Sequence, residues 1–379
     1  MKKVIVLGAG MVGSTIAIDL ADPLANGYQV TVADKDPSRF KFATNKKIKT
    51  STADLSSDSE IKKVIKDFDL VIGALPGFMG FKALKSIIES GKNVVDISFF
   101  PEDPFLLDEL AKEKGVTAIV DCGVSPGFSN IVLGYHYKKM NVNSYKCIVG
   151  GLPFKREWPF EYKAFFSPID VIEEYKRPAR IVVDGKIVEK DALSDSEIIN
   201  YKEVGDLEAF NTDGLRSLLK TIKVPNMVEK TLRYPGHIEL MKIFRAVGFF
   251  DEREIEVNKK FIRPVDLTAK LIFPFWSPKP DEKDFTILQL LVEGETNGKK
   301  TSHQYYIFDE YDSDTRTSSM ARTTGYTCSA AARLFLEGKY SVKGISPPEY
   351  IGFDPNCFDY VVSYLGRKKI HIEHSEKVS

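Results

Sequence analysis

Short apolar runs and amphipathic stretches alternate along the first third of the chain. Five apolar runs and one weaker run predict strands at residues 4–7, 30–33, 49–51, 70–74, 93–96 and 117–120. Apolar positions at helical spacing between these runs predict helices at residues 11–21, 37–44, 58–66, 80–90 and 103–114. Nearly continuous apolar strands separated by helices are typical of a parallel sheet covered on both faces. We therefore expect an α/β domain with a Rossmann, doubly wound parallel sheet.

The pattern changes after Gly127. A helix is expected at residues 128–139, and longer alternating runs predict strands at residues 145–149, 179–183, 254–257 and 285–293. The last of these runs is followed by Asn297-Gly298 and then by residues 301–308, which is the pattern of a β-hairpin. This part of the chain is expected to form a second, α+β domain on a mixed or antiparallel sheet.

These patterns divide the chain into three parts. Residues 1–125 form the expected dinucleotide-binding domain, and residues 126–319 form the expected substrate-binding α+β domain. The remaining part contains a predicted helix at residues 318–337, which Gly338 ends.

Composition excludes several classes of protein. The chain of 379 residues carries 53 basic and 53 acidic side chains, so nothing favours binding to nucleic acid or to an anionic membrane surface. No apolar stretch reaches the roughly 18 residues of a membrane span. The four cysteines form no C-x-x-C pair, so neither a metal site nor a disulfide framework is expected. A cytoplasmic location fits this composition.

A glycine-rich loop joins the first predicted strand to the first predicted helix. Its sequence, Gly8-Ala9-Gly10-Met11-Val12-Gly13, has the dinucleotide-binding spacing G-x-G-x-x-G. Gly8 is expected to permit the tight turn, Gly10 to let the backbone approach the pyrophosphate, and Gly13 to let the helix pack on the strand. The pyrophosphate would then meet the free N–H groups at the helix N-terminus, including those near Met11 and Val12.

Side chains at the ends of the following strands are expected to complete this site. Asp34 ends the second strand, where a carboxylate bonds ribose hydroxyls and disfavours a 2′-phosphate, so NAD is favoured over NADP. Lys35 follows it and could pair with that phosphate, which keeps NADP possible. Asp54 is expected at the adenine or ribose, or alternatively in a helix cap or turn. The loop after the fourth strand should flank the nicotinamide ribose with Leu75, Pro76 and Gly77.

Two further carboxylates end successive strands at the same edge. Asp96 and Asp121 could stabilise a substrate ammonium group or act as a base, although each could equally cap a loop. Thr324 could line the pocket or cap a helix. Asp213 could meet a substrate amine, or it could simply form an Asp-Gly turn.

Several motifs together resemble the saccharopine dehydrogenase family. They are the glycine loop and the segments at residues 74–77, 95–99, 121–130, 210–215, 231–237 and 320–326, which extend over nearly the whole chain. Within the family the chain looks most like the lysine 6-dehydrogenases. Gly123, in the segment Asp-Cys-Gly-Val-Ser-Pro-Gly, is counted with the cofactor-binding residues on this basis.

The resemblance implies an NAD(P)-dependent oxidation at an amine-bearing carbon. The best match implies that L-lysine is oxidised at its ε-amine to 2-aminoadipate 6-semialdehyde, with release of ammonia. Saccharopine or carboxynorspermidine dehydrogenase is the alternative within the family, and a non-catalytic NAD-binding sensor is the alternative of another class. The resemblance also implies a homodimer, and a C-terminal segment at residues 320–379 that returns to the Rossmann domain.

The resemblance also implies which side chains contact the substrate. Arg233 could hold the substrate carboxylate in a bidentate fork, or it could be paired with a nearby acidic residue of the protein. Tyr234 shares its segment, as does His237, which suits either proton transfer or a structural role. Positions that contact substrate in the family correspond to Ser98, Phe99 and Ser125. Since some saccharopine-forming members carry Asp where Ser125 stands, this difference favours another substrate.

Overall fold

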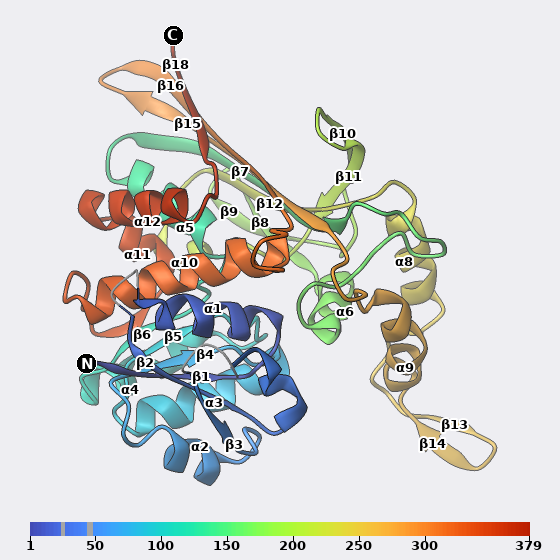
Figure 1. Cartoon of the computed structure of the whole chain (residues 1–379). Coiled ribbons are helices and arrows are strands. Elements are labelled where there is room, and N and C mark those ends of the chain that lie inside the picture. The colour runs from blue at the N-terminus through green and yellow to red at the C-terminus, as the bar shows by residue number, and fades with distance from the viewer. Residues whose placement is uncertain (24–26, 44–47) are drawn as a thin grey trace. The chain divides into compact units, whose positions relative to one another are not determined.

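The computed structural model describes residues 1–23, 27–43 and 48–379, which divide into two compact units (Figure 1). The first unit comprises Met1–Lys139 and Met320–Ile372, and the second comprises Met140–Ser319 and Glu373–Ser379. The first unit extends beyond residue 125 because helix α5 (Phe128–Tyr137) packs against helix α11 (Pro348–Gly352). The two helices approach so closely that a Cβ atom on Gly352 would lie 2.0 Å from the carbonyl oxygen of Ile131.

The first unit is built on a seven-stranded, all-parallel sheet. Its strand order is β3-β2-β1-β4-β5-β6-β17, which reverses direction between β1 and β4 as in doubly wound dinucleotide-binding folds. The strands are β1 (Lys3–Leu7), β2 (Gln29–Asp34), β3 (Lys49–Thr52), β4 (Leu70–Gly73), β5 (Val94–Asp96), β6 (Thr117–Ile119) and β17 (Gly344–Ser346). The predicted Rossmann sheet is therefore confirmed, and β17 joins it from the C-terminal part of the chain.

Helices cover both faces of this sheet (Figure 1). The helices and 3-10 turns are α1 (Met11–Ala21), η2 (Pro37–Ala43), α2 (Asp58–Val64), α3 (Gly77–Glu89), η3 (Pro104–Leu107), α4 (Asp108–Glu113), α10 (Ser319–Leu336) and α12 (Pro355–Arg367), besides α5 and α11. Ile61, Leu84 and Ala111 bring α2, α3 and α4 into one buried cluster with the strands. Helix α10 packs against α1, where a Cβ atom on Gly325 would lie 3.3 Å from Thr15 Cγ2.

The second unit is built on a nine-stranded mixed sheet. Its main path is β10-β11-β12-β7-β15-β16-β18, in which only β12 and β7 run parallel, and β8 pairs with β12 and β9. The strands are β7 (Asn141–Pro153), β8 (Ala179–Val183), β9 (Lys186–Lys190), β10 (Glu197–Tyr201), β11 (Gly205–Asn211), β12 (Asn226–Arg233), β15 (Asp284–Thr296), β16 (Lys299–Glu310) and β18 (Glu373–Val378). The expected mixed or antiparallel sheet is thus observed.

Four helices accompany this sheet: α6 (Pro168–Lys176), α7 (Leu218–Thr221), α8 (His237–Ala246) and α9 (Pro264–Trp276). A buried cluster brings Tyr175 of α6, Met241 of α8 and Trp276 of α9 together with the strand residues Phe210 and Leu232. This cluster forms the core that holds the end of β12 in place.

Several predicted elements differ from the observed ones. The run at residues 254–257 forms β13 (Ile255–Val257), but it pairs only with β14 (Lys260–Ile262) in a separate ribbon because its side chains are exposed and pack on no core. The C-terminal segment joins the first unit only as far as Ile372, since its last residues form β18 of the second sheet. The helix expected at residues 37–44 is a 3-10 turn, and its Thr44 lies outside the described residues.

The predicted hairpin has the expected turn. Strands β15 and β16 pair from Thr296 and Lys299 outward, and Asn297 and Gly298 have φ values of 52° and 77°. Two successive residues with positive φ are the requirement of a type I′ turn, which Asn-Gly satisfies at little cost. None of the helices within residues 1–23, 27–43 and 48–379 has the length and apolar character needed to cross a bilayer.

Candidate functional site

The glycine loop between β1 and α1 has three glycines with three different environments. Gly8 has φ +109°, and a Cβ atom there would lie 2.3 Å from the carbonyl oxygen of Ala74. A Cβ atom on Gly13 would lie 2.2 Å from the carbonyl oxygen of Gly8, so only glycine permits this contact of helix and strand. A Cβ atom on Gly10 would have no atom of the described residues within 4 Å. The first and third glycines therefore serve the fold, and the second leaves open space at the helix N-terminus.

The N-terminus of α1 faces that space with its first residues. Gly10 is the N-cap of the helix and receives no side-chain capping bond, and Met11 at the first helical position is 39% exposed. Val12, the next residue, is buried. Backbone N–H groups at such a helix end, together with the helix dipole, form a binding site for an anion such as a pyrophosphate.

Asp34 at the end of β2 is tied directly to the glycine loop. Its Oδ2 atom accepts a hydrogen bond of 2.8 Å from the N–H of Ala9, and its Oδ1 atom accepts one of 3.0 Å from Asp36. Arg39, in the turn η2, places Nη1 3.8 Å from Asp34 Oδ2 while its side chain is 55% exposed. Arg39 was not predicted from the sequence, in which its only distinguishing feature is its position five residues after Asp34.

The other expected adenosine contacts occupy exposed positions beside Asp34. Lys35 is exposed and helps to lower the pKa of Asp54, whose shift comes mainly from hydrogen bonds with Ser56. Asp54 Oδ1 accepts from Ser56 Oγ at 2.7 Å and from Ser56 N at 3.1 Å, so it also stabilises its own turn. At the end of β4, Leu75 is buried, Pro76 is the N-cap of α3, and Gly77 begins that helix.

Asp96 at the end of β5 lies against the neighbouring strand. Its Oδ1 atom accepts a hydrogen bond of 2.8 Å from the N–H of Ser98, and a Cβ atom on Gly73 would lie 1.8 Å from its Oδ2 atom. Gly73 therefore makes room for this carboxylate. Ser98 is itself buried beside Gly80 of α3, whereas Phe99 is half-buried.

Asp121 follows β6 in a backbone conformation with φ 53°. Residues other than glycine rarely adopt positive φ, and such residues are concentrated at functional sites. Asp121 and Asp96 are brought close by the backbone, since the N–H of Cys122 donates to the carbonyl oxygen of Asp96 at 3.0 Å. Burial raises the pKa of the Cys122 thiol, and the charges of Asp121 and Asp96 raise it further. Cys122 is therefore an inert, buried side chain.

The loop after Asp121 is held by a network that includes the C-terminal part of the chain. Ser129 Oγ donates to Ser125 Oγ at 3.1 Å, and Asn130 Nδ2 donates to Glu349 Oε2 at 3.2 Å. A Cβ atom on Gly123 would lie 3.2 Å from Thr324 Cγ2 of helix α10. Glu349 was missed in the sequence because its contact with residue 130 is long-range, whereas the structure brings Gly123 close to Thr324.

The remaining predicted residues lie in the second unit, around Arg233 at the end of β12. Arg233 is 2% exposed, and its Nη2 atom donates to Glu174 Oε2 at 2.8 Å. Its Nε atom donates to Tyr175 Oη at 2.9 Å, and its guanidinium lies over the Tyr162 ring at 4.4 Å. These contacts match the alternative of an arginine paired with an acid of the protein. The role of substrate clamp stays a prediction that this geometry does not support.

His237 begins α8 next to this arginine. Its Nδ1 atom lies 2.8 Å from the carbonyl oxygen of Phe160, and its Nε2 atom lies 2.9 Å from Tyr175 Oη. Since a carbonyl can only accept, Nδ1 carries the proton and Nε2 accepts from the tyrosine hydroxyl. Burial lowers the pKa of His237 to about 3, with a further decrease from the charge of Arg233. His237 is therefore neutral and fully hydrogen-bonded within the unit.

The last two predicted residues also have protein partners. Tyr234 donates its hydroxyl proton to the carbonyl oxygen of Pro153 at 2.9 Å. Asp213 accepts two hydrogen bonds of 2.8 Å from the guanidinium of Arg180. In this arrangement Asp213 fixes a turn next to β8, as the alternative expectation describes.

Comparison with known proteins matches both parts of the chain to one family. Residues 4–119 match the model of the saccharopine dehydrogenase NADP-binding domain, and residues 123–370 match the model of the saccharopine dehydrogenase C-terminal domain. The chain belongs to the saccharopine dehydrogenase family. It is accordingly an oxidoreductase that uses NAD or NADP and acts on the carbon–nitrogen bond of an amino acid or amine, as the sequence predicted.

Individual relatives extend over the whole chain at low identity. A carboxyaminopropylagmatine dehydrogenase of Synechocystis sp. is 23% identical over 94% of both chains. The L-glutamate-forming saccharopine dehydrogenase of Schizosaccharomyces pombe is 22% identical over 98% of both chains. The solved structure of apo saccharopine dehydrogenase from Saccharomyces cerevisiae aligns with a TM-score of 0.77, 20% identity and full coverage of both chains. This structural similarity confirms the fold of the family member described here.

Proposed function

We propose that this family member transfers a hydride from an amine-bearing carbon of an amino acid to NAD, with L-lysine as the substrate and its ε-amine as the reacting group. The open position at Gly10, at the N-terminus of α1, carries the cofactor half of the proposal because it is where a pyrophosphate would bind. In the overall reaction, the ε-ammonium of lysine, NAD⁺ and water give the 6-semialdehyde, NADH, ammonium and one proton. The protein must therefore accept a proton from the ammonium before the hydride can leave.

Asp96 and Asp121 are the residues we propose for that proton transfer. Both follow strands at the carboxyl edge of the first sheet, where ligands of doubly wound folds bind. Their backbones are joined through the hydrogen bond from Cys122 to Asp96, so the two carboxylates belong to one loop cluster. We assign His237 a positioning role instead, since both of its ring nitrogens already have protein partners.

Oxidation of a secondary amine is the second candidate, and the family relatives favour it. The relative from Synechocystis is named for carboxyaminopropylagmatine, and the one from Schizosaccharomyces pombe for saccharopine. Ser125, which stands where some saccharopine-forming members carry Asp, favours lysine over these larger substrates. A carboxynorspermidine-type substrate belongs with this second candidate.

The preference for NAD rests on Asp34. Its carboxylate ends β2 and is fixed by Ala9 of the glycine loop, so a ribose 2′-hydroxyl could donate to it whereas a 2′-phosphate would be repelled. Lys35 and Arg39 are the cations that NADP would use in its place. We further propose that the enzyme is a homodimer in the cytoplasm, a location that agrees with four buried cysteines that form no disulfide bond.

A matrix of cofactors and amines tests these proposals. Purified protein is mixed with NAD or NADP and with L-lysine, saccharopine, carboxynorspermidine or carboxyaminopropylagmatine, and the absorbance of the reduced cofactor is followed. The lysine proposal expects the highest kcat/KM with L-lysine and NAD. Turnover of a secondary amine alone would replace lysine by the second candidate, and no turnover with cofactor still bound would favour the non-catalytic sensor.

Matched variants test the assignment of the base. Asp121→Asn and Asp96→Asn should each lower kcat by a factor of about 10² to 10⁴ if that residue transfers the proton. Asp67→Asn, at an exposed position distant in sequence from the proposed loop, serves as the control with unchanged kcat. Retention of full kcat in both test variants would remove these carboxylates from the mechanism. Sedimentation equilibrium of the parent protein tests the dimer.

A further inference from the structure

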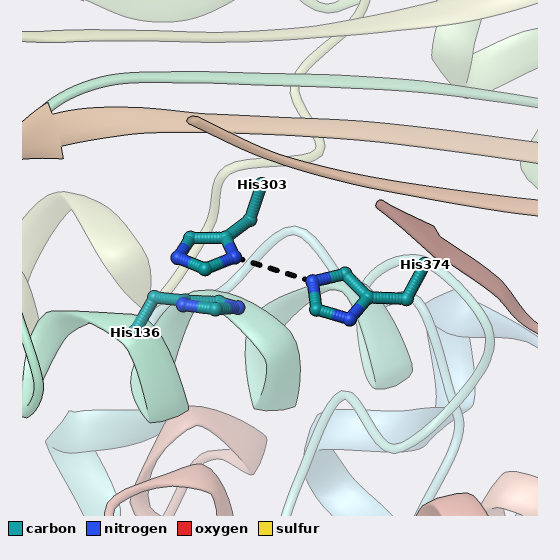
Figure 2. Close-up of side chains that lie close together, drawn as sticks. All are labelled: His136, His303 and His374. Atoms are coloured by element: carbon teal, nitrogen blue, oxygen red, sulfur yellow. Dashed lines mark hydrogen bonds between the residues drawn. The ribbon is translucent and has the colours of Figure 1, made fainter. Parts of the chain in front are cut away.

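Two histidines of the second unit face each other across neighbouring strands. His303 lies on β16 and His374 on β18, and Figure 2 shows the hydrogen bond between His303 Nδ1 and His374 Nε2, which are 3.2 Å apart. His136, which is also drawn there, belongs to helix α5 of the first unit. The cysteine pattern gave no sign of a metal site, and these two histidines are separated by 71 residues in the sequence.

We propose that His303 and His374 form a binding site for a divalent transition-metal ion such as Zn²⁺ or Co²⁺, with Glu376 as a further ligand. Two imidazole nitrogens that each bind zinc at about 2.0–2.1 Å and lie 3.2 Å apart would subtend an angle of roughly 100° at the metal, close to the tetrahedral value. The spacing of the two nitrogens therefore suits one shared ion as well as it suits a shared proton.

The strand pairing places a residue with a carboxylate, Glu376, opposite His303. Glu376 is the partner of His303 in the register of β16 and β18, and Tyr305 is the partner of His374. Because side chains alternate along a strand, all four emerge on the same face of the sheet. Imidazole nitrogen and carboxylate oxygen both bind zinc in proteins, so the two histidines and Glu376 supply ligands of suitable chemistry.

The two imidazole rings have packing partners but can still reorient. The ring of His374 stacks on Tyr305 at 4.3 Å between centroids with an interplanar angle of 17°. In the hydrogen-bonded pair one facing nitrogen carries a proton, so metal binding requires that ring to move its proton to the other nitrogen. Rotation about the soft Cβ–Cγ torsion then directs both lone pairs to one point. The ion would clip the terminal strand β18 to the sheet.

Metal titration of the full chain tests the site without any measurement of dehydrogenase activity. Metal-free protein is titrated with CoCl₂, followed by its visible absorption, and then with ZnCl₂ in a calorimeter. We expect one ion per chain, with the intense visible bands of cobalt in a tetrahedral site and displacement of cobalt by zinc. Octahedral cobalt bands, or binding of less than one ion per chain, would overturn the proposal.

Variants locate the ion. His303→Ala and His374→Ala should each weaken binding at least about tenfold, and Glu376→Gln should weaken it less. His371→Ala is the matched control, because His371 is an exposed histidine three residues before His374 and should leave binding unchanged. His374 lies on an exposed terminal strand, so its variant is expected to fold. Equal affinity in His374→Ala and His371→Ala would overturn the assignment.

Discussion

Glu229 is a carboxyl group whose ionised form is disfavoured by burial. It lies on β12 and is 4% exposed, and its Oε2 atom accepts from Thr212 Oγ1 at 2.5 Å and from Gly214 N at 3.2 Å. Burial, with a smaller contribution from the neighbouring carboxylates of Glu174 and Asp213, raises its pKa to about 8 even though those hydrogen bonds lower it. Glu229 is therefore protonated at neutral pH, and we predict that Glu229→Gln, which resembles the protonated form, stabilises the protein at high pH.

The magnitude follows from the difference between the folded and unfolded pKa of Glu229. The folded protein binds this proton up to pH about 8, whereas the unfolded chain releases it near 4.5, so the free energy of unfolding falls as pH rises between these values. At about 1.4 kcal/mol per pH unit, the loss reaches roughly 3 kcal/mol by pH 7. An amide does not titrate, so Glu229→Gln should not show this loss.

Urea unfolding followed by circular dichroism at pH 5, 6, 7 and 8 measures this effect. The stability of Glu229→Gln relative to the parent should increase steadily over this range, by roughly 1.4 kcal/mol for each unit up to pH 7. Glu189→Gln, at an exposed position on β9, is the control and should follow the parent at every pH. Parallel curves for Glu229→Gln and the parent would refute the reasoning, because they would mean that Glu229 titrates alike in the folded and unfolded states.

Three further predictions concern the cofactor loop and the buried arginine. Gly13→Ala should lower the melting temperature sharply because its Cβ atom would meet the backbone of Gly8, whereas Gly10→Ala should keep the fold and weaken NAD binding. Equal melting temperatures for the two variants would contradict the structural role given to Gly13. Asp34→Ser should weaken NAD binding by about tenfold or more, because a hydrogen bond to a charged group contributes roughly 1.5–3 kcal/mol. It should also shift the cofactor preference toward NADP, and fluorescence titration with each cofactor measures both effects. Arg233→Ala should destabilise the second unit by about 3–5 kcal/mol in urea unfolding, because it leaves Glu174 buried without its cation. If Arg233→Ala instead raised only the substrate KM, the arginine would be a substrate clamp after all.

The parts of the fold that the sequence could predict are those set by local patterns. The glycine loop and its flanking strand and helix are encoded within about twenty consecutive residues, and the turn at Asn297-Gly298 needs only two. Strands β17 and β18 were not predictable in this way. Each is short and joins its sheet by long-range pairing, and β18 carries charged and polar side chains that give no apolar signal.

Arg233 and His237 show why residue type alone did not decide the candidate site. A guanidinium suits a substrate carboxylate and a protein carboxylate equally well, and the sequence gives no sign that Glu174, 59 residues earlier, is the partner. Once α6 brings Glu174 and Tyr175 to the end of β12, the arginine, the tyrosine and the histidine form one continuous chain of hydrogen bonds that ends at the carbonyl oxygen of Phe160. The three guanidinium nitrogens, the tyrosine hydroxyl and both imidazole nitrogens each gain the partner that a buried polar group requires. The segment that most resembled a substrate site thus has, in this structure, the bonding of a structural centre, which is why we propose the carboxylates at the edge of the first sheet for the chemistry.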